Sequence, residues 1–132
     1  MKNNKTTFIS IFIVIILIIG AIFLSNNKSG GSSPVAINNV IIENGKQIIT
    51  INAKGGYTPK ITTAKADMPT IIKIVTNGTF DCSSALSIPS LNYRNNLPPK
   101  GETEIEVPSQ KTGTKLQGIC AMGMYNFSIE FK

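Results

Sequence analysis

The sequence predicts an all-β fold, a Greek-key β-sandwich of about seven or eight strands preceded by one N-terminal transmembrane helix. Short runs rich in isoleucine, valine and threonine alternate apolar with polar residues, as half-buried strands do. Turn-forming pairs such as Asn44-Gly45 separate these runs. Because no helical periodicity of useful length follows residue 25, strands are the favoured elements of the rest of the chain.

The chain begins with an apolar segment. Residues 8–24 carry no charge, and a helix over residues 6–25 would be about 30 Å long, enough to cross a bilayer. The alternative is a cleaved signal peptide, whose apolar region is usually shorter and ends at a small-x-small site. We expect residues 1–25 to be an uncleaved signal anchor. Lys2 and Lys5 favour a cytoplasmic N-terminus, which would place the rest of this single-pass protein on the extracellular or periplasmic side of the cell membrane.

A linker and one domain follow the apolar segment. Residues 26–39 include Ser-Gly-Gly-Ser-Ser, a composition typical of a flexible tether. Residues 40–132 are enough for a single core. Within them, alternation and turn signals predict eight strands, at residues 40–43, 46–53, 60–65, 70–76, 85–88, 103–107, 115–120 and 126–131.

Charge and composition exclude several functions. The formal charge is +6, but the region from Pro34 onward has ten Lys and Arg against seven Asp and Glu, spread along the chain, so we expect no nucleic-acid partner. The chain has no histidine, which excludes zinc hydrolases, Ser-His or Cys-His nucleophiles and His-ligated copper. The three acidic residues Glu102, Glu104 and Glu106 are typical of a solvated strand edge. We therefore expect a protein that is not an enzyme.

The chemistry that remains is that of sulfur. Cys120-Ala121-Met122-Gly123-Met124 places one thiolate and two thioethers within five residues, between two predicted strands. With Cys82 as a fourth ligand, this set suits Cu(I), because soft ligands select soft cations. Strand pairing on both sides would hold the segment in place, and a tight turn at Gly123 or an extended backbone would each bring the three sulfurs together.

Two other interpretations of the sulfur residues remain open. Met122 and Met124 could fill gaps in the core, which is the commoner role of methionine. Cys82 and Cys120 could form a disulfide in the metal-free protein, and their separation of 38 residues corresponds to roughly 4 kcal/mol on the loop-entropy model. The disulfide and metal interpretations are compatible, because two sulfurs close enough to share a metal can also oxidise to a bridge.

Several segments together resemble the cupredoxin-like domains of the EfeO-type family, which have the plastocyanin-like sandwich. The resemblance covers residues 40–132 and is most specific at the Cys-x-Met-x-Met segment. Ala121 and Phe127 stand where the family pattern usually has glycine. The quoted segments are Lys54-Gly55-Gly56-Tyr57-Thr58-Pro59, Pro69-Thr70, Asp81-Cys82-Ser83-Ser84, Ile88-Pro89, Leu97-Pro98, Gly113 and Cys120 to Tyr125.

The resemblance implies roles for the four sulfur residues. Cys82 would occupy the loop that supplies the first histidine of blue-copper relatives, and Cys120 would match their thiolate ligand. Met122 and Met124 would stand where the second histidine and the axial methionine fall.

These inferences predict a membrane-anchored surface protein that binds copper as Cu(I), for capture, handover or resistance. Its partners would be the metal ion, the membrane, and a copper transporter or another metal-handling protein. The alternatives are a disulfide-stabilised interaction module without metal and an electron-transfer cupredoxin. An iron-uptake role rests on the family's name-giving member alone.

Overall fold

The computed structural model describes Ile13, Ile16, Ile18 and residues 39–132. Within this part of the chain, no helix combines the length and apolar character needed to span a bilayer. The expected anchor over residues 1–25 and linker over 26–39 lie outside the described residues, apart from those three isoleucines and Asn39.

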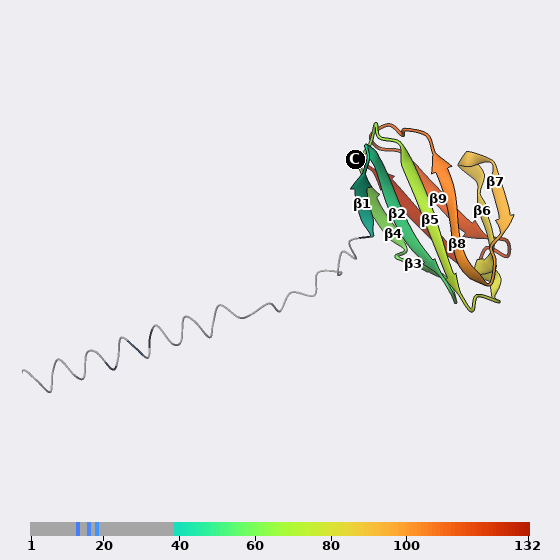
Figure 1. Ribbon diagram of the computed structural model, residues 1–132, viewed down its shortest axis with the longest axis horizontal. Coiled ribbons are helices and arrows are strands. Elements are labelled where there is room, and N and C mark those ends of the chain that lie inside the picture. The colour runs from blue at the N-terminus through green and yellow to red at the C-terminus, as the bar shows by residue number, and fades with distance from the viewer. Residues whose placement is uncertain (1–12, 14–15, 17, 19–38) are drawn as a thin grey trace, which may run out of the picture. The chain divides into compact units, whose positions relative to one another are not determined.

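Residues 39–132 form a β-sandwich, which confirms the all-β prediction (Figure 1). One sheet has the strand order β1-β2-β5-β8, with β3 paired to β2, and the other has the order β4-β10-β9-β6-β7. The strands are β1 (Val40–Glu43), β2 (Lys46–Ala53), β3 (Tyr57–Thr58), β4 (Ile61–Ala64), β5 (Thr70–Asn77), β6 (Ala85–Ile88), β7 (Tyr93–Asn96), β8 (Lys100–Val107), β9 (Lys115–Cys120) and β10 (Asn126–Phe131).

The hairpin predicted at Asn44-Gly45 is confirmed. Strands β1 and β2 pair antiparallel from Glu43↔Lys46 outward, and both turn residues have positive φ, of 50° and 76°, as a tight hairpin turn requires. Strands β2 and β5 are parallel neighbours in one sheet, and β4 and β10 are parallel neighbours in the other. In each pair the chain passes through the opposite sheet before it returns to pair with the earlier strand.

Residues 39–132 contain ten strands, two more than the eight predicted. Strand β3 is only two residues long, too short for an alternating pattern to be visible. Strand β7 has the sequence Tyr-Arg-Asn-Asn, three of whose residues are exposed, so its pairing with β6 leaves no apolar periodicity. Strand β8 begins three residues before its predicted start, because Lys100 pairs with Asn77.

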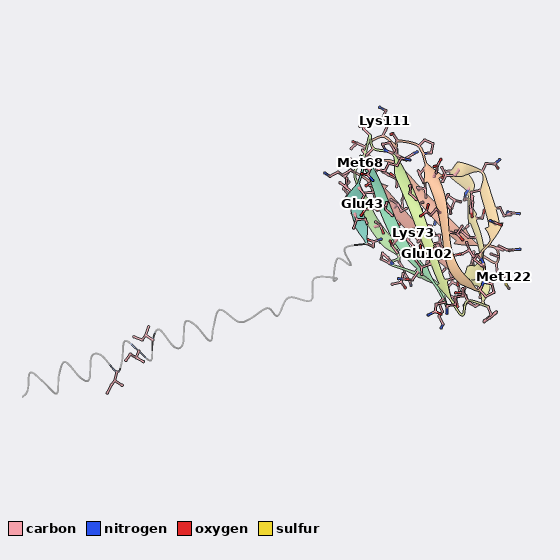
Figure 2. The ribbon with its side chains drawn as sticks, in the orientation of Figure 1. Glu43, Met68, Lys73, Glu102, Lys111 and Met122 are labelled. Atoms are coloured by element: carbon pink, nitrogen blue, oxygen red, sulfur yellow. A yellow bond between two sulfur atoms is a disulfide. The ribbon has the colours of Figure 1, made fainter. Side chains whose placement is uncertain are left out.

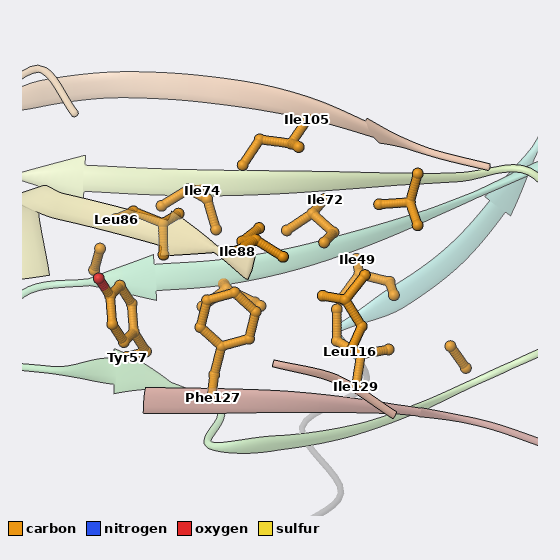
Figure 3. Close-up of a cluster of buried hydrophobic side chains, with 14 of the residues drawn as sticks. Ile49, Tyr57, Ile72, Ile74, Leu86, Ile88, Ile105, Leu116, Phe127 and Ile129 are labelled. Carbon is orange, nitrogen blue, oxygen red and sulfur yellow. The ribbon is translucent and has the colours of Figure 1, made fainter. Parts of the chain in front are cut away.

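The core fills the space between the two sheets (Figure 3). Ile72 and Ile74 of β5 face Leu86 of β6 and Phe127 of β10, and all four are fully buried. Gly118 is needed opposite Phe127, because a Cβ there would lie 2.2 Å from the Phe127 ring. The apolar residues of the alternating pattern therefore form the inward face of each strand.

Candidate metal centre

One end of the sandwich collects the four candidate sulfur ligands, Cys82, Cys120, Met122 and Met124. Strands β2, β5 and β9 end there, and strands β6, β8 and β10 begin there. The strand registers show this, because Asn77 at the end of β5 pairs with Lys100 at the start of β8, and Cys120 at the end of β9 pairs with Leu86 near the start of β6. We call this end the site end. Figure 2 shows Met122 at this end of the sandwich and shows Met68 and Lys111 at the other end. The site end consists of residues 54–60, 77–84, 96–100 and 120–126.

Cys82 lies in the short 3₁₀ helix η1 (Cys82–Ser84), which Asp81 holds in place. One oxygen of the Asp81 carboxylate, Oδ1, accepts hydrogen bonds from the Ser83 backbone N–H at 2.8 Å and from the Ser83 hydroxyl. The other, Oδ2, accepts from the Gly55 N–H at 2.9 Å. Asp81 therefore caps η1 and ties the Cys82 loop to the loop after β2.

Tyr57 supports the same loop from inside the core. Its buried hydroxyl donates to the Ser83 carbonyl at 3.0 Å, and its ring packs edge-on against Phe127 with centroids 5.2 Å apart. Burial, and to a lesser degree the negative charge of Asp81, raises the pKa of Tyr57 to about 12, so its hydroxyl stays protonated at neutral pH.

Cys120 is the last residue of β9 and begins a tight turn. Its backbone N–H donates to the Tyr125 carbonyl at 2.9 Å, and its carbonyl accepts from the Gly123 N–H at 2.8 Å. Gly123 has φ of +73°, a conformation that glycine adopts without strain. The Tyr125 N–H points to Cys120 Sγ at 3.4 Å. Of the two conformations that the sequence allows for this segment, the structure has the turn at Gly123.

The structure joins Cys82 and Cys120 in a disulfide, with their Cα atoms 5.8 Å apart. The Cys120 side chain is 1% exposed, whereas Cys82 is only partly buried. Two loops separated by 38 residues thus bring the two sulfurs into contact.

Met122 and Met124 lie in the turn that follows Cys120, and both are exposed. Their exposed fractions are 75% and 60%, so neither side chain fills a gap in the core. Met124 lines a shallow cavity together with Tyr57, Lys60 and Tyr125. Met68 lies in the turn before β5, at the opposite end of the sandwich, and is not part of the site.

Sulfur atoms are the donors that this end offers to a metal. Within the described residues, no group of three or more Cys, Asp and Glu side chains lies close enough together to hold a metal ion, so a site here needs the thioethers as well as the thiolates. Asp81 is a poor ligand because both carboxylate oxygens accept hydrogen bonds, and these bonds, first from the Ser83 hydroxyl and then from the Gly55 N–H, lower its pKa. The reduced cysteine pair with Met122 and Met124 fits a soft, singly charged cation.

The site end has two features that sequence reasoning did not identify. Phe80, two residues before Cys82, is 82% exposed. Three lysines, Lys54, Lys60 and Lys100, belong to the same end and form no ion pair among the described residues. The Asp-x-Ser spacing at residue 81 is a local signal that could have indicated the capping role of Asp81. The exposure of Phe80 and the clustering of the three lysines, in contrast, have no signal in the neighbouring sequence.

Comparison with known proteins gives a family and a fold. The model of the cupredoxin-like domain family matches residues 13–129. No curated protein matches the chain in sequence. The metal-binding domain of the Streptococcus pneumoniae Cu(I)-exporting P-type ATPase CopA, solved with Cu(I), is similar with a TM-score of 0.63 at 22% identity, over 70% of this chain and 92% of that one.

A second solved structure is similar to the same extent. A copper binding protein in its apo form, solved by NMR, has a TM-score of 0.63 at 24% identity, and the match covers 70% of this chain and 94% of that one. At these identities the two structures establish the sandwich. Because the family model covers most of the sequence, the chain belongs to the cupredoxin-like domain family.

Proposed function

We propose that this domain binds copper as Cu(I) through Cys82 and Cys120, with Met122, Met124 or both completing the site. The observation that carries the proposal is the meeting of the two cysteines at one end, with two exposed methionines in the turn that follows Cys120. A core methionine could not reach a metal at the surface. A thioether that is more than half exposed beside a cysteine pair can, at little cost in packing.

The donor set favours the reduced metal. Thiolates and thioethers are soft ligands, and the chain has no imidazole to stabilise Cu(II). A one-electron carrier role is therefore disfavoured. Copper is the cargo of the site, and the domain is a binder without catalytic activity. Both solved structures are described as copper-binding, which supports the choice of metal.

The cellular role follows from the sequence of the N-terminal region. A signal anchor over residues 1–25 would display the domain outside the membrane, as in the EfeO-type domains that the sequence resembles. There it would capture copper and hand it to a copper transporter or another metal-handling protein, or hold it in a resistance role.

A second candidate function is favoured by the disulfide itself. A bridge across 38 residues stabilises a small sandwich by roughly 4 kcal/mol on the loop-entropy model, which is reason enough to keep two cysteines. In that case the domain would be an interaction module without metal. The two functions differ in what the fully reduced protein does with copper.

A Cu(I) titration separates them. Residues 39–132 have a core of their own, so a soluble fragment that begins at residue 36 is suitable. We expect the reduced fragment, kept under anaerobic conditions, to retain one tightly held copper against a chromophoric Cu(I) chelator. Native mass spectrometry would give the stoichiometry.

Variants assign the ligands. Cys120→Ser should abolish tight binding, Met122→Leu and Met124→Leu should weaken it, and Met68→Leu at the opposite end should leave it unchanged. If the reduced wild-type fragment takes up no copper, the metal-free interaction module is the correct function.

A further inference from the structure

We propose that the Cys82–Cys120 bond is a redox gate on the site, opened by thiol–disulfide exchange in which a dithiol reductant attacks Cys82 rather than Cys120. The choice of sulfur follows from the structure alone. The consequence for copper rests on the proposed function, because only thiolates, and not a disulfide, supply the two cysteine ligands.

The two sulfurs differ in access. Cys120 is 1% exposed, since it ends β9 and is paired with Leu86 of β6 on one side and covered by its own turn on the other. Cys82 is partly exposed and lies in η1, next to the loop that carries the 82% exposed Phe80. Because exchange requires direct approach of the attacking thiolate to a sulfur atom, Cys82 is the one attacked.

The structure also favours Cys120 as the leaving group. The Tyr125 N–H already points at Cys120 Sγ, at 3.4 Å, where it can stabilise the negative charge that develops when the bond breaks. The Cys82 loop stays in place through the hydrogen bonds of Asp81 to Ser83 and Gly55. The two sulfurs therefore remain neighbours after reduction, ready to share a metal.

The exchange balances in two steps. The attacking thiolate forms a bond to Cys82 Sγ while the Cys82–Cys120 bond breaks, and its electron pair leaves with Cys120 Sγ as a thiolate. The second thiolate of the reductant then attacks the reductant's own sulfur that is bonded to Cys82, so that the reductant closes a disulfide and Cys82 leaves as a thiolate. The protein disulfide gains two electrons and two protons in total, and the dithiol is oxidised to a disulfide by the loss of the same number.

The site of attack can be mapped on the wild-type protein. Oxidised full-length protein, or its fragment of residues 36–132, is treated briefly with excess reduced glutathione, a monothiol that attacks the disulfide and remains bound to the attacked cysteine as a mixed disulfide. The reaction is quenched with N-ethylmaleimide and mapped by peptide mass spectrometry. We expect glutathione adducts on Cys82 and maleimide on Cys120. Adducts found mainly on Cys120, or equally on both, would overturn the assignment.

Two single-cysteine variants provide a matched pair. In Cys120→Ser the remaining Cys82 thiol should react with N-ethylmaleimide on the order of tenfold faster than the Cys120 thiol does in Cys82→Ser. Circular dichroism of both variants shows whether they are folded. If both folded variants react at the same rate, the difference in access is not what directs the exchange.

A copper arm tests the gate. Oxidised wild-type protein, titrated anaerobically with tetrakis(acetonitrile)copper(I), should leave copper with the competing chelator, whereas protein that has been reduced with dithiothreitol and then desalted under anaerobic conditions should retain it. Equal binding by the oxidised and reduced forms would overturn the gate. If neither form binds copper, both the gate and the proposed copper function fail. The mapping experiment would still decide which cysteine is attacked.

Discussion

At the scale of single residues, Asp81 organises the surroundings of Cys82 without being a metal ligand. Its carboxylate accepts hydrogen bonds from both the N–H and the hydroxyl of Ser83 and from the N–H of Gly55. These bonds connect the loop after β2 to the loop after β5, two segments 26 residues apart in the chain. The position of Cys82 therefore depends on a neighbouring side chain as much as on its own packing.

Replacing Asp81 by asparagine should destabilise the domain by about 1 kcal/mol, because asparagine can still cap η1 but leaves the Gly55 N–H without its acceptor. An amide offers only one oxygen, so the Gly55 N–H would face an NH₂ group. Because the hydrogen bonds lower the pKa of Asp81, the carboxylate stabilises the fold above the pKa of the unfolded chain, and this contribution is lost as pH falls through the folded-state pKa. Thermal unfolding at neutral and acidic pH should show a gap between wild type and Asp81→Asn that closes in acid.

Asp67→Asn is the matched control for this experiment. Among the described residues the Asp67 carboxylate pairs with Lys111 alone, and both side chains are mostly exposed, so the change should have little effect at either pH. A gap for Asp81→Asn that is the same at both pH values would show that the ionised carboxylate contributes nothing to stability.

At the scale of elements, the turn between β9 and β10 decides how the sulfurs are presented. Its hydrogen bonds from Cys120 to Tyr125 and from Gly123 to Cys120 close a tight loop, which leaves Met122 and Met124 exposed and Cys120 buried. Gly123 has a positive φ, which residues other than glycine rarely adopt, and a Cβ added there would meet no neighbouring atom within 4 Å. Backbone conformation, and not space, is what selects glycine.

Gly123→Ala should therefore cost about 1 kcal/mol of unfolding free energy, measured by urea denaturation of the oxidised fragment. Gly123→Asn should cost less, since asparagine adopts the left-handed conformation more readily than alanine. Equal costs for the two variants would mean that the positive φ is not the cause. In the reduced fragment, Gly123→Ala should also weaken Cu(I) binding, because it disturbs the turn that carries both methionines.

At the scale of the whole domain, the charges are distributed unequally between the two ends. Lys111 and Lys132 at the end opposite the sulfurs pair with Asp67 and Glu130, and Lys73 on the sheet face pairs with Glu102 and Glu104. At the site end, three lysines, Lys54, Lys60 and Lys100, are accompanied by a single acidic residue, Asp81. The site end is therefore positively charged and should attract anionic donors of copper.

On the proposed copper function, uptake of Cu(I) from an anionic chelate such as the bathocuproine disulfonate complex should slow as ionic strength rises. Replacing Lys54, Lys60 and Lys100 together by glutamine should slow uptake by about tenfold at low salt and remove most of the salt dependence. Stopped-flow absorbance of the chelate measures the rate. The same replacement of Lys46, Lys65 and Lys111, at the other end, should have little effect. An equal slowing by the two triple variants would exclude local steering.

Local patterns predicted much of the sandwich, because side-chain alternation and turn residues act over a few neighbouring positions. The Asn44-Gly45 hairpin and the inward faces of β5 and β10 are examples. Strands β3 and β7 were missed because partner strands, and not their own sequences, make them strands. The signal anchor expected from the apolar N-terminal run stays a prediction, since residues 1–25 lie almost entirely outside the described part.

The sequence by itself determined the chemistry available to the site: four sulfur residues in two segments, with no imidazole to compete. Residue type is a local property, so it can be read directly from the chain. Only the tertiary structure decided that Cys82 meets Cys120, that Cys120 is buried while Met122 and Met124 are exposed, and that Asp81 is engaged in hydrogen bonds. These properties depend on strand register and on contacts between loops far apart in the chain, which no local pattern encodes.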